Sequence, residues 1–256
     1  MIPSPLAKDI RQAAALIKET PNCVALTGAG SSTPSGIPDF RSAGSGLWTR
    51  YLPMEVASLT TFRHHPERFF EWLRPLASHM LQAQPNPAHI ALAELENQGL
   101  LKTIITQNID GLHQRAGSKS VLEVHGTLNT LSCAGCYKQY RSDPYLDPYL
   151  EFGEIPFCPT CGGTLKPDVV LFEEQLPIKT WLAAKKAAES CDLMLITGSS
   201  LAVMPVAGLP ATALQHGAKV IIINQSATYI DDQAAVVLTG DIADILPTIV
   251  NQLIDD

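Results

Sequence analysis

The sequence has no excess of basic residues. Its 256 residues include 18 Lys and Arg against 25 Asp and Glu, a formal net charge of −7. Because contacts with nucleic-acid phosphates need a basic surface, this composition argues against nucleic-acid binding, and we expect no specific nucleic-acid partner. An acidic surface is compatible with a basic peptide partner.

Long hydrophobic runs are also missing. The longest mostly apolar segment, 201–214, contains prolines, Gly208 and Thr212, and is shorter than the roughly 20 apolar residues that a membrane span requires. The first ten residues have no basic region followed by an apolar stretch, so no secretory signal is predicted. We expect a cytoplasmic protein that does not contact membranes.

A secreted disulfide framework is not indicated either. Four of the six cysteines form two Cys-x-x-Cys pairs, Cys133/Cys136 and Cys158/Cys161. In a chain without a secretion signal this spacing favours a metal site, with free or disulfide-linked cysteines as the alternative. Four thiolates close a tetrahedral shell and leave no position for substrate, so the pattern predicts one structural zinc ion. Cys23 and Cys191 are expected to be inert core thiols.

The rest of the chain alternates short apolar runs with amphipathic segments. The predicted strands are 24–27, 103–106, 121–124, 192–197, 220–223 and 235–238. The predicted helices are 87–98, 177–189, 205–216 and 241–253. Continuous apolar runs are typical of strands buried on both faces, so the pattern predicts an α/β fold with a Rossmann-like, doubly wound parallel sheet.

Two segments interrupt this alternation. One, 39–84, contains a helix at 66–81 and no convincing strand, and the other, 128–165, contains the cysteine pairs and has no helical period. Together they predict a small domain made of a helical insert and a zinc-ribbon-like module. The large domain then comprises 1–38, 85–127 and 166–256.

Glycines and small residues follow the first strand in the sequence Gly28-Ala29-Gly30-Ser31-Ser32. This is the place of the phosphate-binding turn in a doubly wound fold, although a tight strand–helix turn explains the pattern about as well. Thr33 stands where the dehydrogenase fingerprint has its third glycine, and no acidic residue follows at the usual ribose position. Hydride transfer is therefore disfavoured.

Polar residues follow several other strands. Gln107, Asn108 and Asp110 come after 103–106 and are expected either to bind a ligand or to cap and form turns. His125 ends the strand 121–124 and has the pKa of a general base, although a lone histidine is more often structural. The remaining strand-end groups form a row long enough for a dinucleotide, namely Gly198-Ser199-Ser200, Asn224-Gln225-Ser226 and Gly240-Asp241-Ile242.

An acid, an aromatic ring and a guanidinium occur consecutively in Asp39-Phe40-Arg41, within a predicted loop. A solvated turn is one interpretation. The apolar ring between two charges favours the other, a lid that excludes water from a reactive ligand.

Taken together, these segments resemble the sirtuin family of NAD-dependent protein deacylases, in its bacterial type. The similar segments run in family order from about residue 22 to residue 247 and include Gly28–Ser32, Gly36–Arg41, Thr106–His113, His125-Gly126, the four paired cysteines, Pro167–Val170 and Gly198–Leu201.

The resemblance implies that NAD binds between the two domains and is consumed as a co-substrate. His125 would be the general base, and Asn108 and Asp110 would orient the nicotinamide ribose and carboxamide. The implied NAD-binding residues are Gly28, Ala29, Gly30, Ser32, Asp39, Phe40, Arg41, Gln107, Asn108, Ile109, Asp110, Gly198, Ser199, Ser200, Asn224, Gln225, Ser226 and Ile242. The products would be free lysine, nicotinamide and O-acetyl-ADP-ribose.

The resemblance also implies an acetyl-lysine protein or peptide as substrate. We expect the protein to be a monomer. The peptide would form a strand between Val170-Leu171-Phe172 and Val203-Met204. Glu173 departs from the family, which usually has glycine there, and its carboxylate is expected to favour basic residues near the modified lysine.

A second departure concerns the acyl group. Family members that remove succinyl groups carry Tyr and Arg three residues apart on the helix that here has Leu73 and Leu76. An apolar pocket without a cation would leave a buried carboxylate undersolvated, so we expect neutral acyl groups, acetyl above all.

Two other functions remain as alternatives to deacetylation. Mono-ADP-ribosyl transfer would use the same sugar with another acceptor, and the peptide edge at 170–172 disfavours it. A catalytically silent NAD-binding domain would need neither His125 nor Asn108.

Overall fold

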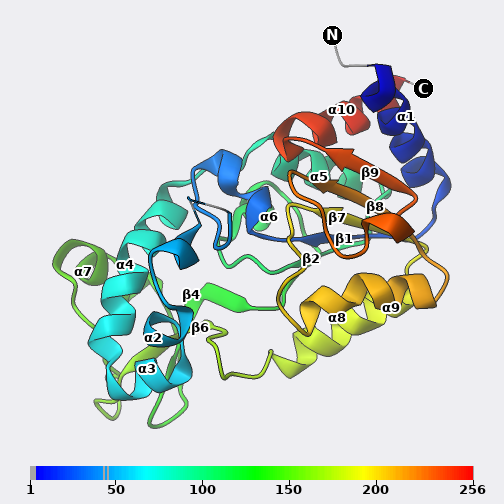
Figure 1. Ribbon diagram of the computed structural model, residues 1–256. Helices are drawn as coiled ribbons and strands as arrows, with labels where there is room; N and C mark the ends of the chain where they lie inside the picture. The colour runs from blue at the N-terminus through cyan, green and yellow to red at the C-terminus, as the bar shows by residue number, and fades with distance from the viewer. Residues whose placement is uncertain (1–3, 43, 45, 256) are drawn as a thin grey trace. The chain divides into compact units, whose positions relative to one another are not determined.

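The computed structural model describes residues 4–42, 44 and 46–255, and the chain forms two compact units (Figure 1). Unit 1 comprises the described residues of 1–35, 84–124 and 178–256, and unit 2 comprises those of 36–83 and 125–177.

Unit 1 is built on a six-stranded parallel sheet with the strand order β3-β2-β1-β7-β8-β9. The strands are β1 Cys23–Thr27, β2 Thr103–Thr106, β3 Val121–Glu123, β7 Leu193–Thr197, β8 Lys219–Asn224 and β9 Val236–Thr239. The order reverses between β1 and β7, which is the place where doubly wound sheets bind their ligands. The predicted Rossmann-like sheet is confirmed.

Helices cover both faces of this sheet (Figure 1). On one face lie α1 Ser4–Glu19, α5 Pro87–Asn97 and α10 Ile242–Asp255, and on the other lie α8 Ile178–Ser190 and α9 Leu209–Gln215. Short turns complete the unit: η1 Ala29–Ser31, η2 Thr33–Ser35, α6 Leu112–Arg115, η4 Val206–Gly208 and η5 Asp231–Gln233.

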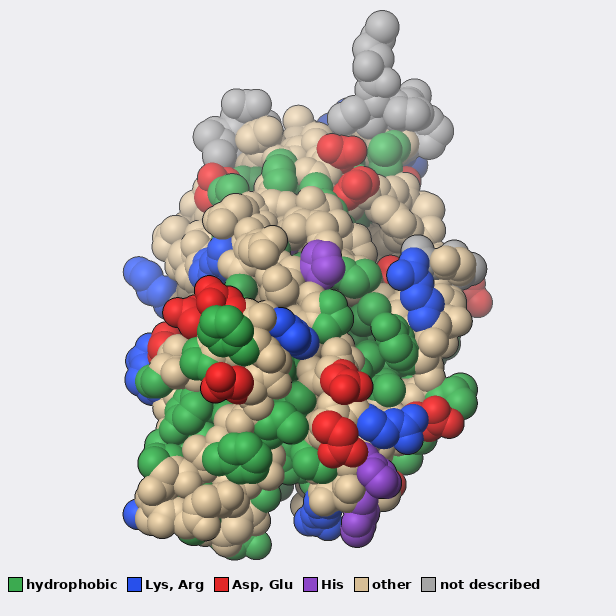
Figure 2. All heavy atoms as spheres, turned by 90° about the vertical axis from the view of Figure 1, so that its left-hand side faces the viewer, with side chains coloured by type: hydrophobic (Ala, Val, Ile, Leu, Met, Phe, Trp, Pro, Cys, Tyr) green, Lys and Arg blue, Asp and Glu red, His purple; other side chains and the backbone are tan. Residues whose placement is uncertain are grey.

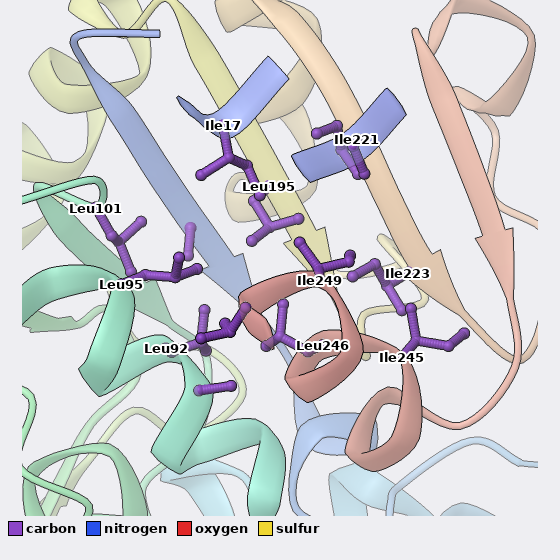
Figure 3. Close-up of a cluster of buried hydrophobic side chains, with 14 of the residues drawn as sticks. Ile17, Leu92, Leu95, Leu101, Leu195, Ile221, Ile223, Ile245, Leu246 and Ile249 are labelled. Atoms are coloured by element: carbon purple, nitrogen blue, oxygen red, sulfur yellow. The ribbon is translucent and has the colours of Figure 1, made fainter. Parts of the chain in front are cut away.

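The core of unit 1 lies between the sheet and the first helical layer. Figure 3 shows Ile17 of α1, Leu95 of α5 and Leu246 of α10 packing with Leu195 of β7 and Ile221 of β8. These five side chains are fully buried. Each such side chain contributes about 1.5–3 kcal/mol relative to an exposed one, so the sheet ends that carry the candidate site rest on a rigid support.

The predicted helix 87–98 corresponds to α5, and its start has a clear local cause. Pro87 occupies the first helical turn, and the Asn86 side chain accepts a hydrogen bond from the Ala88 N–H at 2.9 Å. Such a cap satisfies a backbone donor that has no partner within the helix. The predicted helix 205–216 is shorter in the structure, because 206–208 form a 3-10 turn and α9 begins at Leu209.

Unit 2 contains a three-stranded antiparallel sheet with the order β5-β4-β6. Its strands are β4 Gly126–Cys133, β5 Gln139–Arg141 and β6 Leu165–Val169. Its helices are α2 Pro53–Val56, α3 Leu59–His64, α4 Pro66–Gln82 and α7 Asp143–Phe152, with the turn η3 Leu47–Thr49. Because β6 pairs with β4, residues 166–177 belong to unit 2, whereas the sequence pattern placed them with the large domain.

Helix α7 was not predicted from the sequence. It contains two prolines and lacks an apolar period, and its contacts with α4 account for its position: the Tyr149 hydroxyl donates to the Phe70 carbonyl at 2.6 Å, and Arg74 donates to the carbonyls of Leu150 and Glu151. Tertiary contacts therefore stabilise this helix where local propensity does not.

Figure 2 looks onto the side of Figure 1 on which α4 and α7 are drawn, and hydrophobic side chains gather there in patches between charged ones. Across the part of the chain that the structure describes, no helix is long and apolar enough to cross a bilayer.

Candidate active site and metal site

The ends of β1 and β7 meet backbone against backbone in unit 1. The Gly28 N–H donates to the Thr197 carbonyl at 3.2 Å, and the Gly30 N–H donates to the Gly198 carbonyl at 2.8 Å. A side-chain Cβ on Gly28 or Gly30 would lie 2.9 or 2.8 Å from the Gly198 oxygen, closer than real Cβ atoms approach. Gly198 itself has φ +59°, and a Cβ on it would overlap the Ser31 nitrogen. The glycines therefore permit the two loops to touch.

This turn leaves one amide group available. The N–H groups of Gly28, Gly30, Ser31 and Ser32 all donate within the turn or to the β7 loop, whereas none of the hydrogen bonds among the described residues uses the Ala29 N–H. Ala29 is half-buried and lies beside Gly28, Gly30 and Gly198. Its N–H is therefore suited to donate a hydrogen bond to a phosphate oxygen. The residues thus fit the pyrophosphate of a dinucleotide.

Asn108, Ser32 and Asp110 form a hydrogen-bonded group beside this turn. The Asn108 amide donates to the Gly28 carbonyl at 3.0 Å and to the Ser32 hydroxyl at 3.1 Å. The Ser32 hydroxyl donates to the Asp110 carboxylate at 2.7 Å, and the same carboxylate accepts the Leu112 N–H. The amide and the carboxylate are therefore held in fixed orientations by the phosphate turn.

The row of strand ends continues across β7 and β8. Gln107 donates to the Ser199 hydroxyl at 2.9 Å. Ser199 and Asn224 exchange two hydrogen bonds, from the Ser199 N–H and to its carbonyl. The structure thus brings together residues from the ends of β2, β7 and β8, as the sequence predicts for a long ligand.

Other predicted residues of unit 1 are less closely connected to this network. Ile109 is half-buried, Ile242 is buried, and Ser200, Gln225, Ser226 and Met204 are exposed at their loops. Val203 accepts the Ala207 N–H through its carbonyl.

Two buried histidines, His89 and His113, contact each other in unit 1, and His89 interacts electrostatically with Asp110. The sequence pattern predicts a functional role for neither ring. The His113 Nε2 atom is 2.9 Å from the Thr27 hydroxyl, and the rings of His113 and His89 contact each other with centroids 4.9 Å apart. Burial lowers the pKa of His113 to about 3, with His89 adding to the effect, and burial lowers that of His89 to about 4 against the attraction of Asp110. Both rings are neutral near pH 7.

Two sequence features mark this pair: His113 ends the segment Thr106–His113, and His89 lies at the start of α5. Asn86 caps the helix, and its side-chain amide donates to the Ser31 carbonyl at 2.9 Å. The Asn86 backbone N–H donates to Nδ1 of His89, the third helical residue, at 3.3 Å. The helix start is therefore connected to the phosphate turn.

In unit 2, the loop that contains Asp39, Phe40 and Arg41 is folded on itself. The Asp39 carboxylate accepts the N–H groups of Arg41 and Ser42 at 2.8 and 2.7 Å. Although burial acts in the opposite direction, hydrogen bonds from Ser42 and Arg41 hold the Asp39 pKa below its usual range. The Trp48 N–H donates to the Phe40 carbonyl at 3.0 Å, and the two rings are 5.1 Å apart.

His125 is half-buried and lies in the turn after β3, one residue before β4 begins at Gly126. Its carbonyl accepts the Val170 N–H at 2.8 Å, which joins it to the segment after β6. Gly126 follows with φ +81°, and a Cβ there would overlap the Asp168 carbonyl oxygen. The close crossing of β4 and β6 at Gly126 therefore sets the backbone position of His125.

The segment predicted to bind peptide, Val170–Phe172, is also in unit 2. The Phe172 N–H donates to the Ala57 carbonyl and its carbonyl accepts the Leu59 N–H. The Glu173 carboxylate accepts the Thr60 N–H at 2.9 Å. The Glu173 carboxylate therefore has a hydrogen-bond partner within the chain.

The four paired cysteines converge in the zinc module of unit 2. All four Sγ atoms lie within 4.8 Å of one another, and Cys133 and Cys161 are 3.4 Å apart at sulfur. Four sulfurs at about 2.3 Å from a tetrahedral zinc are about 3.8 Å apart, so the donor set fits zinc, whereas a disulfide needs about 2.05 Å.

Backbone donors support this interpretation. The N–H groups of Gly135 and Cys136 point at the Cys133 sulfur, and that of Thr160 points at the Cys158 sulfur. Such donors favour thiolate over thiol, which is the form that binds metal.

Comparison with known proteins agrees with the motifs. A sequence model described as the Sir2 family matches residues 28–205. The NAD-dependent protein deacylase 2 of Archaeoglobus fulgidus is 44% identical over 246 residues, covering 96% of this chain and 96% of that protein.

Solved structures give the same result. One from a study of the structural basis for the mechanism and regulation of Sir2 enzymes has a TM-score of 0.91 and 44% identity, covering 97% of this chain and 98% of the other. A Sir2 variant with a deacetylated p53 peptide and 3'-O-acetyl ADP-ribose has a TM-score of 0.89 and 37% identity, covering 95% of this chain and 98% of the other.

Proposed function

The chain belongs to the Sir2 family, and as such it is an NAD-dependent protein-lysine deacetylase in which, we propose, His125 is the general base and Asn108 and Asp110 orient the sugar of NAD. The observation that carries this assignment is the hydrogen-bonded group of Asn108, Ser32 and Asp110 at the strand-order reversal of the sheet. A pyrophosphate turn alone would serve any nucleotide. An amide and a carboxylate fixed beside it favour chemistry at the adjacent sugar.

Unit 1 supplies most of the proposed NAD site. The Ala29 N–H would bind phosphate, because none of the hydrogen bonds among the described residues uses it, and Gly28, Gly30 and Ser32 would line the same turn. Ser199 and Asn224, which fix each other's orientation, would line the ribose and adenine end. Gln107 would bind ribose from the end of β2.

Unit 2 supplies the proposed base, the lid and the peptide edge. NAD would supply an electrophilic sugar carbon, and the overall reaction would convert NAD, acetyl-lysine and one water into nicotinamide, free lysine and O-acetyl-ADP-ribose. His125 accepts the proton of a ribose hydroxyl at a ring nitrogen, because imidazole is the side chain with a pKa suited to this step near neutrality. Phe40 excludes water from the reactive sugar, and Arg41 binds phosphate.

The substrate is an acyl-lysine peptide, and we propose that it is acetylated and pairs with Val170–Phe172 and Val203-Met204. Extended main-chain pairing gives affinity with little sequence selectivity. The four cysteines hold a structural zinc that takes no part in the reaction, since four thiolates complete its shell.

We further propose that the protein acts as a monomer in the cytoplasm, without nucleic-acid partners. Four thiolates that must stay reduced to bind zinc favour a reducing compartment.

The test is incubation with NAD and an acetyl-lysine peptide, with nicotinamide and free lysine measured together. Deacetylation releases both in equal amounts. Nicotinamide with a retained acetyl group and a modified protein acceptor would instead indicate ADP-ribosyl transfer, and NAD binding without nicotinamide would indicate a silent binding domain. His125→Ala should reduce lysine formation by about 10²–10⁴-fold without changing thermal stability, the range expected for loss of a general base.

A further inference from the structure

Glu173 adopts a backbone conformation that its side chain disfavours. Its φ is +74°, in the left-handed region that few residues other than glycine adopt. The chain thus combines a backbone conformation typical of glycine with a carboxylate side chain. A strained residue of this kind persists only when its surroundings hold it in place.

The surroundings of Glu173 are four consecutive residues of another segment, 57–60. Glu173 Oε2 accepts the Thr60 N–H at 2.9 Å. The residue before it, Phe172, donates to the Ala57 carbonyl at 2.9 Å and accepts the Leu59 N–H at 3.0 Å. Three hydrogen bonds thus join 172–173 to 57–60, and we call this set the 57–60 clasp.

The charge of the carboxylate suits this internal partner. Hydrogen bonds from Thr60 and then the positive charge of Arg63 lower the Glu173 pKa, so the group is ionised near neutral pH. An ionised acceptor makes a stronger hydrogen bond with an N–H than a neutral one does.

The neighbouring residues of the same edge, 170 and 171, have partners outside the 57–60 clasp. The Val170 N–H donates to the His125 carbonyl at 2.8 Å, and the Leu171 N–H donates to Glu174 Oε2 at 2.9 Å. Glu174 in turn forms an ion pair with Lys166 at 2.9 Å. These contacts fix 170 and 171, and the 57–60 clasp fixes 172 and 173.

We propose that Glu173 is a positioning residue, which fastens the peptide-binding edge to residues 57–60 and does not read the charge of the substrate. This inference rests on the proposed role of Val170–Phe172 in peptide binding. A fixed edge loses less conformational freedom when the peptide pairs with it, so the clasp lowers the peptide KM and leaves the chemical step unchanged.

The test compares Glu173→Gln, Glu173→Ala and Glu173→Gly on two acetyl-lysine peptides of equal length, one with arginines beside the modified lysine and one with serines. Glu173→Gln keeps an oxygen acceptor and should leave both KM values within about twofold. Glu173→Ala should raise the KM of both peptides about fivefold, the ratio that corresponds to one hydrogen bond of ordinary net strength. The kcat and the KM for NAD should stay unchanged.

Glu173→Gly separates the effect of backbone strain at residue 173 from the effect of losing the hydrogen bond to Thr60. It relieves the backbone strain, so its thermal stability should equal or exceed that of Glu173→Ala, while its peptide KM should rise in the same way. The matched control is Gln175→Ala, an exposed neighbour outside the 57–60 clasp, which should change neither.

Hydrogen exchange at the Thr60 amide gives a readout independent of activity. It should be about fivefold faster in Glu173→Ala than in the unsubstituted protein, because its acceptor is gone. Unchanged peptide KM values in Glu173→Ala would overturn the proposal. A KM increase confined to the arginine peptide would also overturn the proposal, because it would show that the Glu173 carboxylate attracts basic residues of the substrate. If the unsubstituted protein released no nicotinamide at all, the proposed function would fail, while the exchange measurement would still test the clasp.

Discussion

The Trp48 ring meets the Phe172 ring at an edge, with centroids 6.0 Å apart and planes at 64°. The same indole contacts Phe40 at 5.1 Å and stacks on Trp72 at 5.9 Å. One side chain therefore supports both the proposed water-excluding ring and the proposed peptide edge.

Trp48→Ala should lower kcat/KM for acetyl-lysine peptide about tenfold, because it removes two aromatic contacts of about 0.5–1.5 kcal/mol each from residues that face substrates. Trp48→Phe should retain most of the activity. Steady-state kinetics with peptide varied at saturating NAD gives the measurement, and Trp181→Phe, in α8 of unit 1, is the control. Equal activity of Trp48→Ala and the unsubstituted protein would remove this role.

The histidine pair predicts a stability that depends on pH. The folded-state pKa values of His113 and His89 are about 3 and about 4, below the ordinary 6.5, so the unfolded chain binds more protons in acid. Their contribution is present above pH 6.5 and is lost as pH falls from there towards 4 and 3, by about 1 kcal/mol per pH unit for each ring.

Urea unfolding at pH 7.5, 6 and 5 would measure this dependence. His113→Gln should reduce the dependence of the unfolding free energy on pH by about the contribution of one histidine. Replacement of the exposed His216 by Gln should leave this dependence unchanged. A slope that does not differ between His113→Gln and the unsubstituted protein would contradict burial of a neutral imidazole.

Gly126→Ala should destabilise the protein more than Gly99→Ala does. Both glycines have positive φ, +81° and +76°, but only Gly126 has backbone atoms where a Cβ would lie. Gly99→Ala should cost about 1 kcal/mol for the conformation alone, and Gly126→Ala about 3 kcal/mol or more, since β4 and β6 must separate. Equilibrium unfolding gives both values, and similar losses would show that the β4–β6 crossing adapts easily.

Removal of zinc should unfold the zinc module. Its buried hydrophobic cluster consists of Leu131, Cys133, Cys158 and Leu165, of which two are proposed ligands, so little core remains without the ion. Metal analysis should give one zinc per chain, Cys136→Ser should reduce this value, and Cys191→Ala should not. Chelation should abolish deacetylation and change the near-ultraviolet circular dichroism. A fully active protein without metal would refute a structural zinc.

Acetyl-lysine should be cleaved at least about tenfold faster than succinyl-lysine, because a buried carboxylate would lack a cation. Leu73 and Leu76 are buried, and the one cation between them, Arg74, donates to carbonyls of α7. Leu73→Tyr with Leu76→Arg should raise succinyl activity relative to acetyl activity. Arg74→Gln is the control and should leave the acyl preference unchanged, whereas faster cleavage of succinyl-lysine by the unsubstituted protein would contradict the assignment.

The parallel sheet could be predicted from sequence because its strands are buried on both faces and form continuous apolar runs, as in 193–197 and 220–223. Helix α1 was missed although it packs on α10. Helix α7 could not have been found from periodicity, because contacts from Phe70 and Arg74 position it.

The sequence predicts which strand ends carry the residues of the site, but not the hydrogen bonds that connect these residues. That Gly28 and Gly30 touch Gly198 depends on β1 and β7 being neighbours, which strand order decides and local sequence does not. The opposite holds for the cysteines, whose spacing alone predicts their convergence. The engagement of Glu173 with Thr60 joins residues 113 positions apart, and no local pattern indicates it.

The contact between the β1 turn and the β7 loop also limits how this protein can diverge. Gly28, Gly30 and Gly198 occupy one shared space, so a methyl group at any of them must push the other loop away and tilt two strand ends. A second replacement among these three residues cannot make room for the added methyl group, because glycine has no side chain that could be made smaller. We therefore expect variation in nucleotide preference to arise at 225–226, where the side chains are exposed, and not at this junction.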